Sequence, residues 1–572
     1  MKTNIRSLLC VIALAIATVL IVYGISQPVE HEVRWLIFLW AAAPLLGLAA
    51  WLSRPSLPPG LPRNTYNLAL TVSIGFVLIS FQLLRQQVVQ AQAVYHYVEP
   101  GQGISNIRPV LASQRVKRGA ILDRNHVVLV QSELADNGFA HRVYPLTSQF
   151  DPHAFSNITG FFSTRFGQSG LEATYSEYLS GERGNELRNL RDTLLGNPIE
   201  GNSLHLTLNA NLQAQAAALL GGRNGSVVVL DPRTGAVLAM VSVPGFDPRG
   251  LSFDPSAPDW EVENVRVGAY WNQINDPAAR QPLLNRPTQG QYPPGSTFKT
   301  VTAVAALEYA ARAQPEAITC PNQLEVEVGA PPVVNAVPGL GSLTGNPSTL
   351  ERVYAYSCNT AFAQYALRLG ADQLAEVARR FDIYQPQDAP RSYAEFSDLV
   401  TTSSHLYVQP GFLNRPAALA DTGYGQGQLL LTPLQMALVA AAIANDGMMM
   451  QPYLVQRVTD PDGRVIMERQ PQPIRQTMSE RTATTMRSHM RAVAQYGFGS
   501  IVSSFVPGVA VGGKSGTAEL APGVTPHAWF IAIAPVEQPR YAVAVMIEHG
   551  GEGSGAAAEL AGQVLQAAFA TE

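Results

Sequence analysis

The residues best suited to chemistry are a serine and a lysine three positions apart, Ser296 and Lys299. They follow the turn-forming residues 293–295, and the alanine-rich stretch 301–312 predicts a helix directly after them. Ser296 is therefore expected in a first helical turn, where backbone N–H groups are unpaired and the helix dipole is positive. The Lys299 amine is expected on the same helix face. A serine hydroxyl needs a base to become a nucleophile, and a lysine desolvated near other cations can be neutral enough to serve.

An arbitrary Ser-x-x-Lys is more often a helix N-cap followed by a surface lysine, because both residue types are common. This chain weakens that interpretation, since only four of its 39 lysine and arginine residues are lysine: Lys2, Lys117, Lys299 and Lys514. Arginine carries the remaining positive charge and cannot be deprotonated to act as a base. The choice of lysine at position 299 therefore indicates that its side chain must be able to lose a proton.

Two later segments carry polar residues beside predicted elements. Ser357 and Asn359 open an apolar helix predicted over 360–369, and they offer a hydroxyl that can relay a proton and an amide that can hold a carbonyl or the lysine. Residues 509–513 predict a strand that runs into Lys514-Ser515-Gly516-Thr517, where a cation, two hydroxyls and a close backbone approach suit a carboxylate. Taken separately, the first segment is more often a helix cap and the second a chance turn.

Taken together, Ser-x-x-Lys, Ser-x-Asn and Lys-Ser-Gly occur in the order typical of serine enzymes that act on D-Ala-D-Ala peptides and β-lactams. The chain from about residue 201 to 572 resembles the transpeptidase domain of penicillin-binding proteins. Further blocks share the resemblance: Gly425-Gln426-Gly427 with residues 431–437, and His527-Ala528-Trp529-Phe530 with Ala534-Pro535.

The segment Arg118-Gly119 with Asp123-Arg124 resembles the pedestal of the class B, monofunctional members. No glycosyltransferase segment precedes it, which favours class B over class A. Two departures concern anchoring and the pedestal rather than catalysis: three apolar N-terminal stretches where one is usual, and Asn125-His126 where the family usually has a glycine turn.

The resemblance implies an α+β fold, in which a penicilloyl-serine transferase domain with a central antiparallel sheet flanked by helices follows a pedestal and three transmembrane helices. It implies Ser296 as nucleophile and Lys299 as base, with Ser357 and Lys514 returning a proton to the leaving group. Backbone N–H groups of Ser296 and Thr517 would hold the oxyanion. Asn359 is the remaining implied catalytic residue and orients the donor peptide, and the implied substrate-binding residues are Ser515, Gly516 and Thr517.

The implied activity is a membrane-anchored peptidoglycan D,D-transpeptidase that cross-links stem peptides of lipid-linked glycan strands and is acylated by β-lactams. The implied partner is a membrane-embedded peptidoglycan polymerase, a glycosyltransferase of the SEDS type. Two alternatives use the same motifs: a protein that hydrolyses or senses β-lactams, and a catalytically silent cell-wall scaffold. A β-lactamase gains nothing from a membrane pedestal, and the intact motifs disfavour a silent scaffold. A role in elongation, division or sporulation stays open.

Composition excludes several other functions. A net charge of −4 and a pI near 6.2 give no basic surface for nucleic acid. The ten histidines and three cysteines show no HExxH, CxxC or other zinc spacing, so no metal is expected. No Walker loop or dinucleotide fingerprint occurs, so no cofactor is expected either.

Region 1–90 contains three apolar stretches, 8–25, 35–52 and 68–84, each near the length of about 17–25 residues that spans a bilayer. Lysine and arginine before the first stretch and between the second and third place the N-terminus in the cytoplasm. An odd number of spans then places the rest of the chain outside the bacterial plasma membrane. The third stretch is diluted by polar residues, and as a peripheral helix it would leave the large domain in the cytoplasm. A cleavable signal peptide is the alternative for the first stretch.

Residues 91–200 are expected to form an extracytoplasmic pedestal, with a dimerisation-like role and no catalytic residues. The third helix is expected to continue over 85–97, followed by two strands joined by a turn at 123–126 and a helix with a glycine start over 160–181. The transpeptidase domain, 201–572, begins with a strand over 203–208 and a helix over 211–220. A hairpin then turns at 231–235, and its continuous apolar runs predict a sheet covered on both faces.

Cys320 and Cys358 follow the apolar stretches, so the predicted topology exposes both to an oxidising compartment, whereas Cys10 lies within the first stretch. We predict a disulfide between Cys320 and Cys358, which would fix the Ser-x-Asn segment beside the nucleophile. Two separate buried thiols are the alternative, because sequence does not give the geometry.

Overall fold

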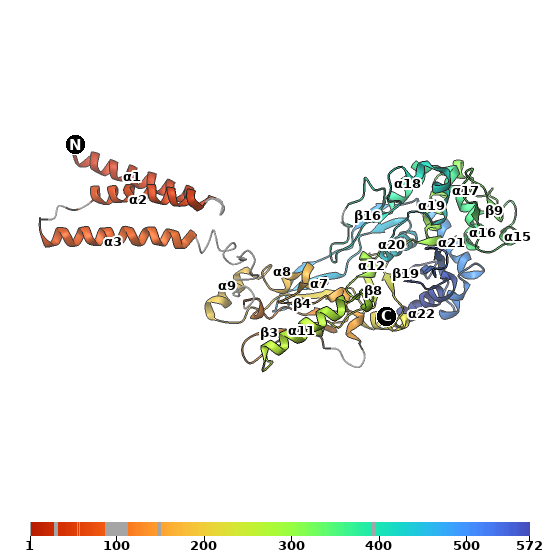
Figure 1. The fold of residues 1–572 in the computed structure, drawn as a ribbon, viewed down its shortest axis with the longest axis horizontal. Helices are drawn as coiled ribbons and strands as arrows, with labels where there is room; N and C mark the ends of the chain where they lie inside the picture. The colour runs from red at the N-terminus through yellow and green to blue at the C-terminus, as the bar shows by residue number, and fades with distance from the viewer. Residues whose placement is uncertain are drawn as a thin grey trace. The chain divides into compact units, whose positions relative to one another are not determined.

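The computed structural model describes residues 2–27, 32–53, 55, 58–85, 112–145, 150–390, 393 and 395–571. The chain divides into two compact units, residues 1–113 and 114–572. The first unit contains three long helices, α1 (Lys2–Ile25), α2 (Glu32–Ser53) and α3 (Leu61–Leu84) (Figure 1). All three are long and apolar enough to cross a membrane.

Within the first unit, α1 packs against α2 through small side chains. Ala17 of α1 and Ala42 of α2 are both fully buried in one apolar cluster, as expected where helices approach closely in an apolar environment. Helix α3 begins at Leu61 rather than near Leu68. Its first turn contains Pro62 and polar residues, so the apolar stretch alone does not reveal where the helix begins. The continuation predicted over 86–97 lies outside the described residues.

The second unit is built around a five-stranded sheet with the order β17-β18-β19-β7-β8. Its strands are β7 (Gly225–Leu230), β8 (Val237–Val243), β17 (Gly512–Ala518), β18 (His527–Ala534) and β19 (Tyr541–Ile547). Every neighbouring pair is antiparallel. The hairpin β7–β8 confirms the predicted turn, and the sheet is the central antiparallel sheet that the sequence resemblance implies.

Both faces of this sheet are covered, which explains the continuous apolar runs of its strands. Val227 and Val229 of β7 pack into a cluster with α10 (Ala210–Leu220) and α22 (Ala558–Ala570). Val228 and Leu230 face the opposite way, into a cluster with α20 (Pro433–Ala444). All residues of α20 are buried, and a helix that is apolar all round must lie in a core.

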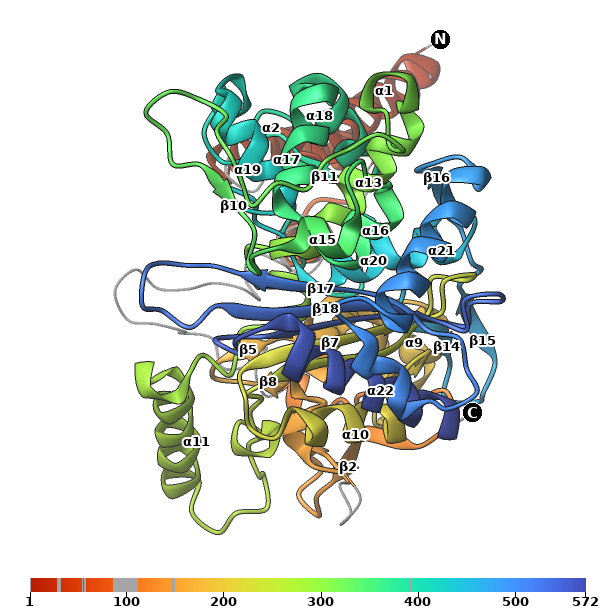
Figure 2. The ribbon, with the colours of Figure 1, turned by 90° about the vertical axis from the view of Figure 1, so that its right-hand side faces the viewer.

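A layer of helices lies beyond α20, on the side of the sheet away from α10 and α22 (Figure 2). Its helices are α13 (Lys299–Glu308), α14 (Ala310–Ala313), α15 (Leu340–Thr344), α16 (Leu350–Ala355), α17 (Asn359–Leu369), α18 (Ala371–Arg380), α19 (Pro416–Tyr424) and α21 (Glu480–Gln495). Short strand pairs join this layer: β9 (Gln323–Leu324) with β10 (Val333–Val334), β11 (Ile383–Tyr384) with β12 (Ser404–His405), and β13 (Met448–Met450) with β16 (Pro473–Gln476).

A second sheet of six strands has the order β15-β14-β6-β1-β2-β3. Its first three strands along the chain are β1 (Ile121–Leu122), β2 (Val128–Leu134) and β3 (Ala140–Val143), and the rest are β6 (Ser203–Leu206), β14 (Val455–Thr459) and β15 (Val465–Glu468). The predicted turn at 123–126 joins β1 to β2. Strands β14 and β15 come from far along the chain, so this sheet links the pedestal region to the catalytic region, which the sequence pattern did not predict.

The prediction of a helix over the whole of 160–181 is only partly correct. Residues 160–169 contain the short hairpin β4 (Phe162–Ser163) and β5 (Gly167–Gln168), and helix begins only with α7 (Gly170–Thr174) and α8 (Ser176–Leu179). Gly160 and Gly167 have φ of 75° and 80°, a backbone conformation that an α-helix does not contain. Further α-helices among the described residues of this unit are α6 (Ser156–Thr159), α9 (Glu186–Leu195), α11 (Trp260–Asn275) and α12 (Arg286–Gln289).

A buried ion cluster joins these pedestal elements. The Glu172 carboxylate accepts hydrogen bonds from Arg118 Nε at 2.9 Å and from Arg142 Nε at 2.6 Å. None of the three side chains is more than 5% exposed. Burial alone would raise the pKa of Glu172, but the guanidinium groups of Arg142 and Arg118 lower it below its ordinary value. The cluster therefore holds an ionised carboxylate between two segments, β1–β3 and α7.

Candidate active site

The Ser296 turn is placed by its contact with strand β17. Ser296 lies in a 3₁₀ turn, Gly295–Phe298, that leads directly into α13. Gly295 has φ of 55°, and a Cβ atom there would lie 2.5 Å from the carbonyl oxygen of Thr517. Only glycine fits this position, and its absence of a side chain brings the first turn of the helix against β17.

The Lys299 side chain is fully buried, and oxygen atoms surround its amine. Its Nζ atom lies 2.9 Å from Ser296 Oγ, 2.7 Å from the Ser357 carbonyl oxygen and 3.0 Å from Ser357 Oγ. It also lies 2.6 Å from Asn359 Oδ1. The predicted convergence of Ser-x-x-Lys and Ser-x-Asn is therefore present in the structure.

The environment of Lys299 favours the neutral amine. Burial, and then the positive charge of Lys514, lower the pKa of Lys299 well below its ordinary value. A neutral amine has two N–H donors and one lone pair. The carbonyl oxygens of Asn359 and Ser357 can accept the two N–H groups, which leaves the lone pair to accept the proton of the Ser296 hydroxyl. This geometry is the one that a general base requires.

Ser357 adopts a left-handed backbone conformation with φ of 56°, which is uncommon for a residue with a side chain. Its Oγ atom lies 3.0 Å from the Nζ atoms of both Lys299 and Lys514. Conformations of this kind persist where the surroundings determine them, and they concentrate at functional sites. The Ser357 Oγ atom therefore links the two lysines.

Lys514 is also fully buried. Its Nζ atom lies 2.8 Å from the Ser515 carbonyl oxygen and 5.7 Å from the centroid of the Tyr354 ring. Burial lowers the pKa of Lys514 to about 7. Lys514 is therefore partly protonated near neutral pH, and its positive charge adds to burial in favouring the neutral amine of Lys299.

The remaining residues of the β17 segment present hydroxyl and backbone groups. The Thr517 Oγ1 atom accepts a hydrogen bond from the Gly553 N–H at 3.2 Å, so the Thr517 O–H remains available to donate. Ser515 Oγ has no hydrogen-bond partner among the described residues. A Cβ atom at Gly516 would lie 2.7 Å from the Pro294 carbonyl oxygen, so glycine is what allows β17 to lie against the Ser296 turn.

Asn359 is held by a strand that the sequence pattern did not connect with the site. Its Nδ2 atom donates to the carbonyl oxygen of Val334 in β10 at 2.8 Å, which orients Oδ1 toward Lys299. The next residue, Asn335, accepts a hydrogen bond from the Thr360 N–H at 3.2 Å. A backbone carbonyl carries no residue-type signal, so the contribution of Val334 could not be found from sequence.

The structure joins Cys320 and Cys358 by a disulfide, with Cα atoms 6.2 Å apart. Asn335 Nδ2 donates to the carbonyl oxygen of Pro321 at 2.8 Å. This hydrogen bond closes the segment 320–335 on itself, and the bridge attaches the segment to Cys358, directly before α17.

The site consists of serine, threonine, lysine and asparagine side chains and backbone groups, which are poor ligands for a catalytic transition metal. Within the described ranges, no group of three or more His, Cys, Asp or Glu residues could hold a metal ion.

Comparison with known proteins agrees with this geometry. Residues 225–566 match the family described as the penicillin binding protein transpeptidase domain. The chain belongs to this family. Residues 118–204 match a second family, the penicillin binding protein A dimerisation domain. The class B resemblance, the transpeptidase fold and the preceding pedestal or dimerisation domain are therefore confirmed, and the chain is a serine penicillin-binding transpeptidase.

Known proteins are similar to this penicillin-binding protein over most of its length, in sequence and in structure. Peptidoglycan D,D-transpeptidase PbpA of Mycolicibacterium smegmatis is 34% identical over 78% of this chain and 87% of the relative. Peptidoglycan D,D-transpeptidase MrdA of Haemophilus influenzae is 30% identical over 72% of this chain and 64% of the relative. A solved structure of penicillin-binding protein A from M. tuberculosis, an imipenem acyl-enzyme complex, superposes with a TM-score of 0.70. That structure is 32% identical and corresponds to 80% of this chain and 100% of its own.

Proposed function

We propose that this penicillin-binding protein cross-links peptidoglycan stem peptides through an acyl-enzyme on Ser296, and that β-lactams inhibit it by forming a stable ester at the same oxygen. The observation that carries this assignment is the fully buried Lys299 amine, 2.9 Å from Ser296 Oγ.

In the acylation step, Ser296 Oγ attacks the carbonyl carbon between the two terminal D-alanines of a stem peptide. The neutral Lys299 amine takes the hydroxyl proton as the C–O bond forms. Backbone N–H groups of Ser296 and Thr517 stabilise the negative charge that develops on the carbonyl oxygen. The amide of Asn359 orients the donor peptide.

The leaving D-alanine needs a proton on its nitrogen as the C–N bond breaks. Ser357 Oγ supplies it, and the ammonium of Lys514, 3.0 Å from that oxygen, replaces the proton that Ser357 gives up. The residues Ser515, Gly516 and Thr517 bind the terminal carboxylate of the donor. An amine of a neighbouring stem peptide then attacks the ester carbonyl carbon, and its proton passes through Ser357 Oγ to Lys514. As the ester C–O bond breaks, Lys299 returns its proton to Ser296 Oγ, which restores the enzyme and leaves the cross-link.

A product assay tests this activity. The full chain is incubated with a peptide ending in D-Ala-D-Ala and an excess of an amine acceptor, and mass spectrometry separates amide products from hydrolysed peptide. We expect the amide product to dominate and to disappear in Ser296→Ala. Predominant hydrolysis at saturating acceptor would favour a hydrolase or carboxypeptidase instead.

We further propose that α1, α2 and α3 anchor residues 1–90, with the N-terminus cytoplasmic and residues 91–200 and 201–572 outside as pedestal and transpeptidase domains. Lys2 and Arg6 at the N-terminal end of α1, Arg54 directly after α2 and Arg63 in the first turn of α3 support this orientation. A membrane-embedded peptidoglycan polymerase of the SEDS type is the proposed partner. Cysteine labelling with a membrane-impermeant reagent on either side of the membrane tests the topology.

A further inference from the structure

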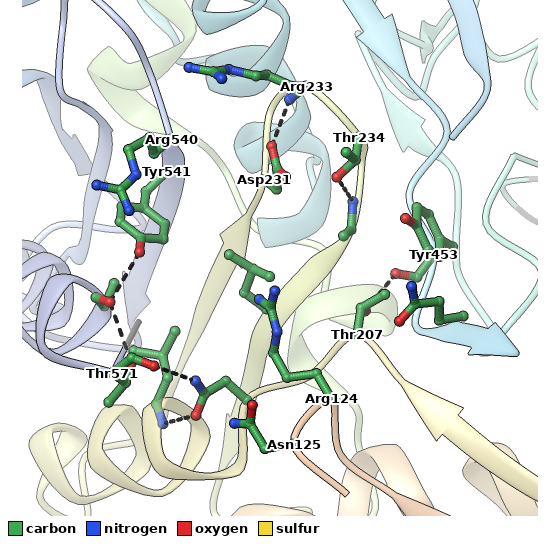
Figure 3. A pocket seen from close by; sticks show the side chains of 16 residues that line it. Arg124, Asn125, Thr207, Asp231, Arg233, Thr234, Tyr453, Arg540, Tyr541 and Thr571 are labelled. Carbon is green, nitrogen blue, oxygen red and sulfur yellow. Dashed lines mark hydrogen bonds between the residues drawn. The ribbon is translucent and has the colours of Figure 1, made fainter. Parts of the chain in front are cut away.

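The second unit contains a cavity of about 620 Å³ that shares no residue with the active-site motifs (Figure 3). The turn between β7 and β8 and the start of β19 form one side of it, while the turn between β1 and β2 and strand β14 form the other. It therefore lies where the pedestal sheet meets the catalytic sheet. Strand β8 is the edge strand opposite β17, and β7 lies next to it, so the cavity is separate from the Ser296 site.

Positive charge dominates the wall of this cavity. Three arginines, Arg124, Arg233 and Arg540, line it against a single carboxylate, Asp231. The other polar lining residues offer amide and hydroxyl groups, and the apolar ones include Leu212, Leu238 and Ala568. A volume of this size fits a ligand larger than a single inorganic ion.

Two of these guanidinium groups make no contact that stabilises the fold through a hydrogen bond or an ion pair among the described residues. The side chains of Arg124 and Arg233 have no hydrogen bond or ion pair with any residue that the structure describes. The Arg233 backbone N–H donates to Asp231 Oδ1 at 2.9 Å. Figure 3 shows the Arg124 side chain extending from the β1–β2 turn among the other lining residues. A planar guanidinium presents paired donors that match a carboxylate.

We propose that this cavity is a second peptide site that binds the carboxylates of an un-cross-linked stem peptide. The proposal rests on the proposed function, which places the cavity in the same compartment as the polymer. Arg124 and Arg233 would each bind a carboxylate, from the pedestal and from the catalytic sheet respectively. A bound peptide would thereby connect the two sheets and keep the enzyme on its polymer while Ser296 completes a reaction.

The experiment uses the full chain in nanodiscs, after penicillin has acylated Ser296 so that the active site is blocked. The probe is the dye-labelled pentapeptide L-Ala-γ-D-Glu-L-Lys-D-Ala-D-Ala, followed by fluorescence anisotropy. The variants are Arg124→Gln, Arg233→Gln and the double substitution. The matched control is Arg481→Gln, an exposed arginine of α21 outside the cavity lining. A peptide with amidated carboxylates and inorganic phosphate serve as competitors.

We expect saturable binding to the acylated enzyme, weakened about tenfold or more by each cavity substitution and unchanged by Arg481→Gln. The amidated peptide should not compete. Absence of binding, equal binding by the double variant, or equal competition by phosphate or the amidated peptide would overturn the proposal. Penicillin labelling of each variant shows that it is folded. If penicillin does not label Ser296 in the unsubstituted enzyme, that result contradicts the proposed function rather than the second peptide site.

Discussion

The Nζ atom of Lys514 lies 3.0 Å from the Oγ atom of Ser357. The same oxygen lies 3.0 Å from Lys299 Nζ, which in turn lies 2.9 Å from Ser296 Oγ. A continuous path of hydrogen-bonding atoms therefore joins the nucleophile to a second buried lysine. The two lysines are separated by more than two hundred positions in sequence, and only the packing of β17 against the helical layer brings them together.

This path predicts a pH dependence of acylation. The pKa of Lys514 is lowered to about 7 by burial, so its ammonium predominates below that pH and the neutral amine above it. Because the ammonium is the form that supplies a proton and attracts a carboxylate, the second-order acylation rate should fall as the pH rises through about 7. That rate constant reports on groups of the free enzyme.

Lys514→Arg tests which group causes the decline, because a guanidinium stays charged at all accessible pH values. We expect the alkaline decline to be absent in this variant, even if its rate is lower throughout. Stopped-flow acylation by a chromogenic β-lactam measures both profiles. An identical decline in the two proteins would assign the titration to another group.

Lys299→Arg keeps the charge and removes the base. Acylation by penicillin should fall by about 10²-fold or more, the scale for losing a general base. Lys117→Arg is the matched control, because Lys117 pairs with Glu200 at 3.0 Å and both are partly exposed, and it should acylate at the normal rate. A normal rate in Lys299→Arg would mean that Lys299 is not the base.

The sequence motifs indicated the residues that meet in the structure better than local patterns indicated the framework around them. Ser-x-x-Lys, Ser-x-Asn and Lys-Ser-Gly could be found because each needs particular side chains at fixed spacing, and the hairpin 226–243 could be found from its turn. The support from Val334 could not, because it acts through a backbone carbonyl. The positive φ of Ser357 has no residue-type signal either.

Long-range pairing was the other limit of prediction. Strands β14 and β15 complete the pedestal sheet although they lie about 250 positions after β6, and strand partners this distant leave no mark on local periodicity. The helix expected over 160–181 begins only at Gly170, because Gly160 and Gly167 form turns rather than helix starts. Their local sequence is compatible with both.

The Cys320–Cys358 bridge predicts a thiol-labelling pattern. Intact-mass alkylation of the unreduced full chain should leave both cysteines unlabelled until reductant is added. In the chain-entropy account, closing this loop stabilises the fold by about 4 kcal/mol or less. Quantitative labelling of both thiols before reduction would show that the bridge is absent from the protein.

The buried cluster around Glu172 predicts a loss of pedestal stability. Glu172→Gln leaves Arg118 and Arg142 buried without their carboxylate, so local stability should fall by about 3–5 kcal/mol. The control is Glu177→Gln, because Glu177 is 69% exposed and lies 3.9 Å from Arg183, and it should cost less than about 1 kcal/mol. Hydrogen exchange of the β2 amides, followed by mass spectrometry, measures both.

The same cluster predicts that acid lowers the stability of the folded pedestal. The pKa of Glu172 is lower in the folded protein than its ordinary value of 4.5, so the folded state loses stability as the pH falls below that value. Protection of the β2 amides should decline in this acid range in the unsubstituted protein and depend less on pH in Glu172→Gln. Parallel pH profiles would exclude Glu172 as the cause.

The most direct test of the account is the position of the penicillin adduct. The full chain is labelled with penicillin, digested and mapped by tandem mass spectrometry, in parallel with Ser296→Ala, whose folding is checked by hydrogen exchange. We predict a single penicilloyl ester on Ser296 and no adduct in the variant. An adduct on any other residue, or labelling that persists in Ser296→Ala, would contradict the assignment of Ser296 as the nucleophile.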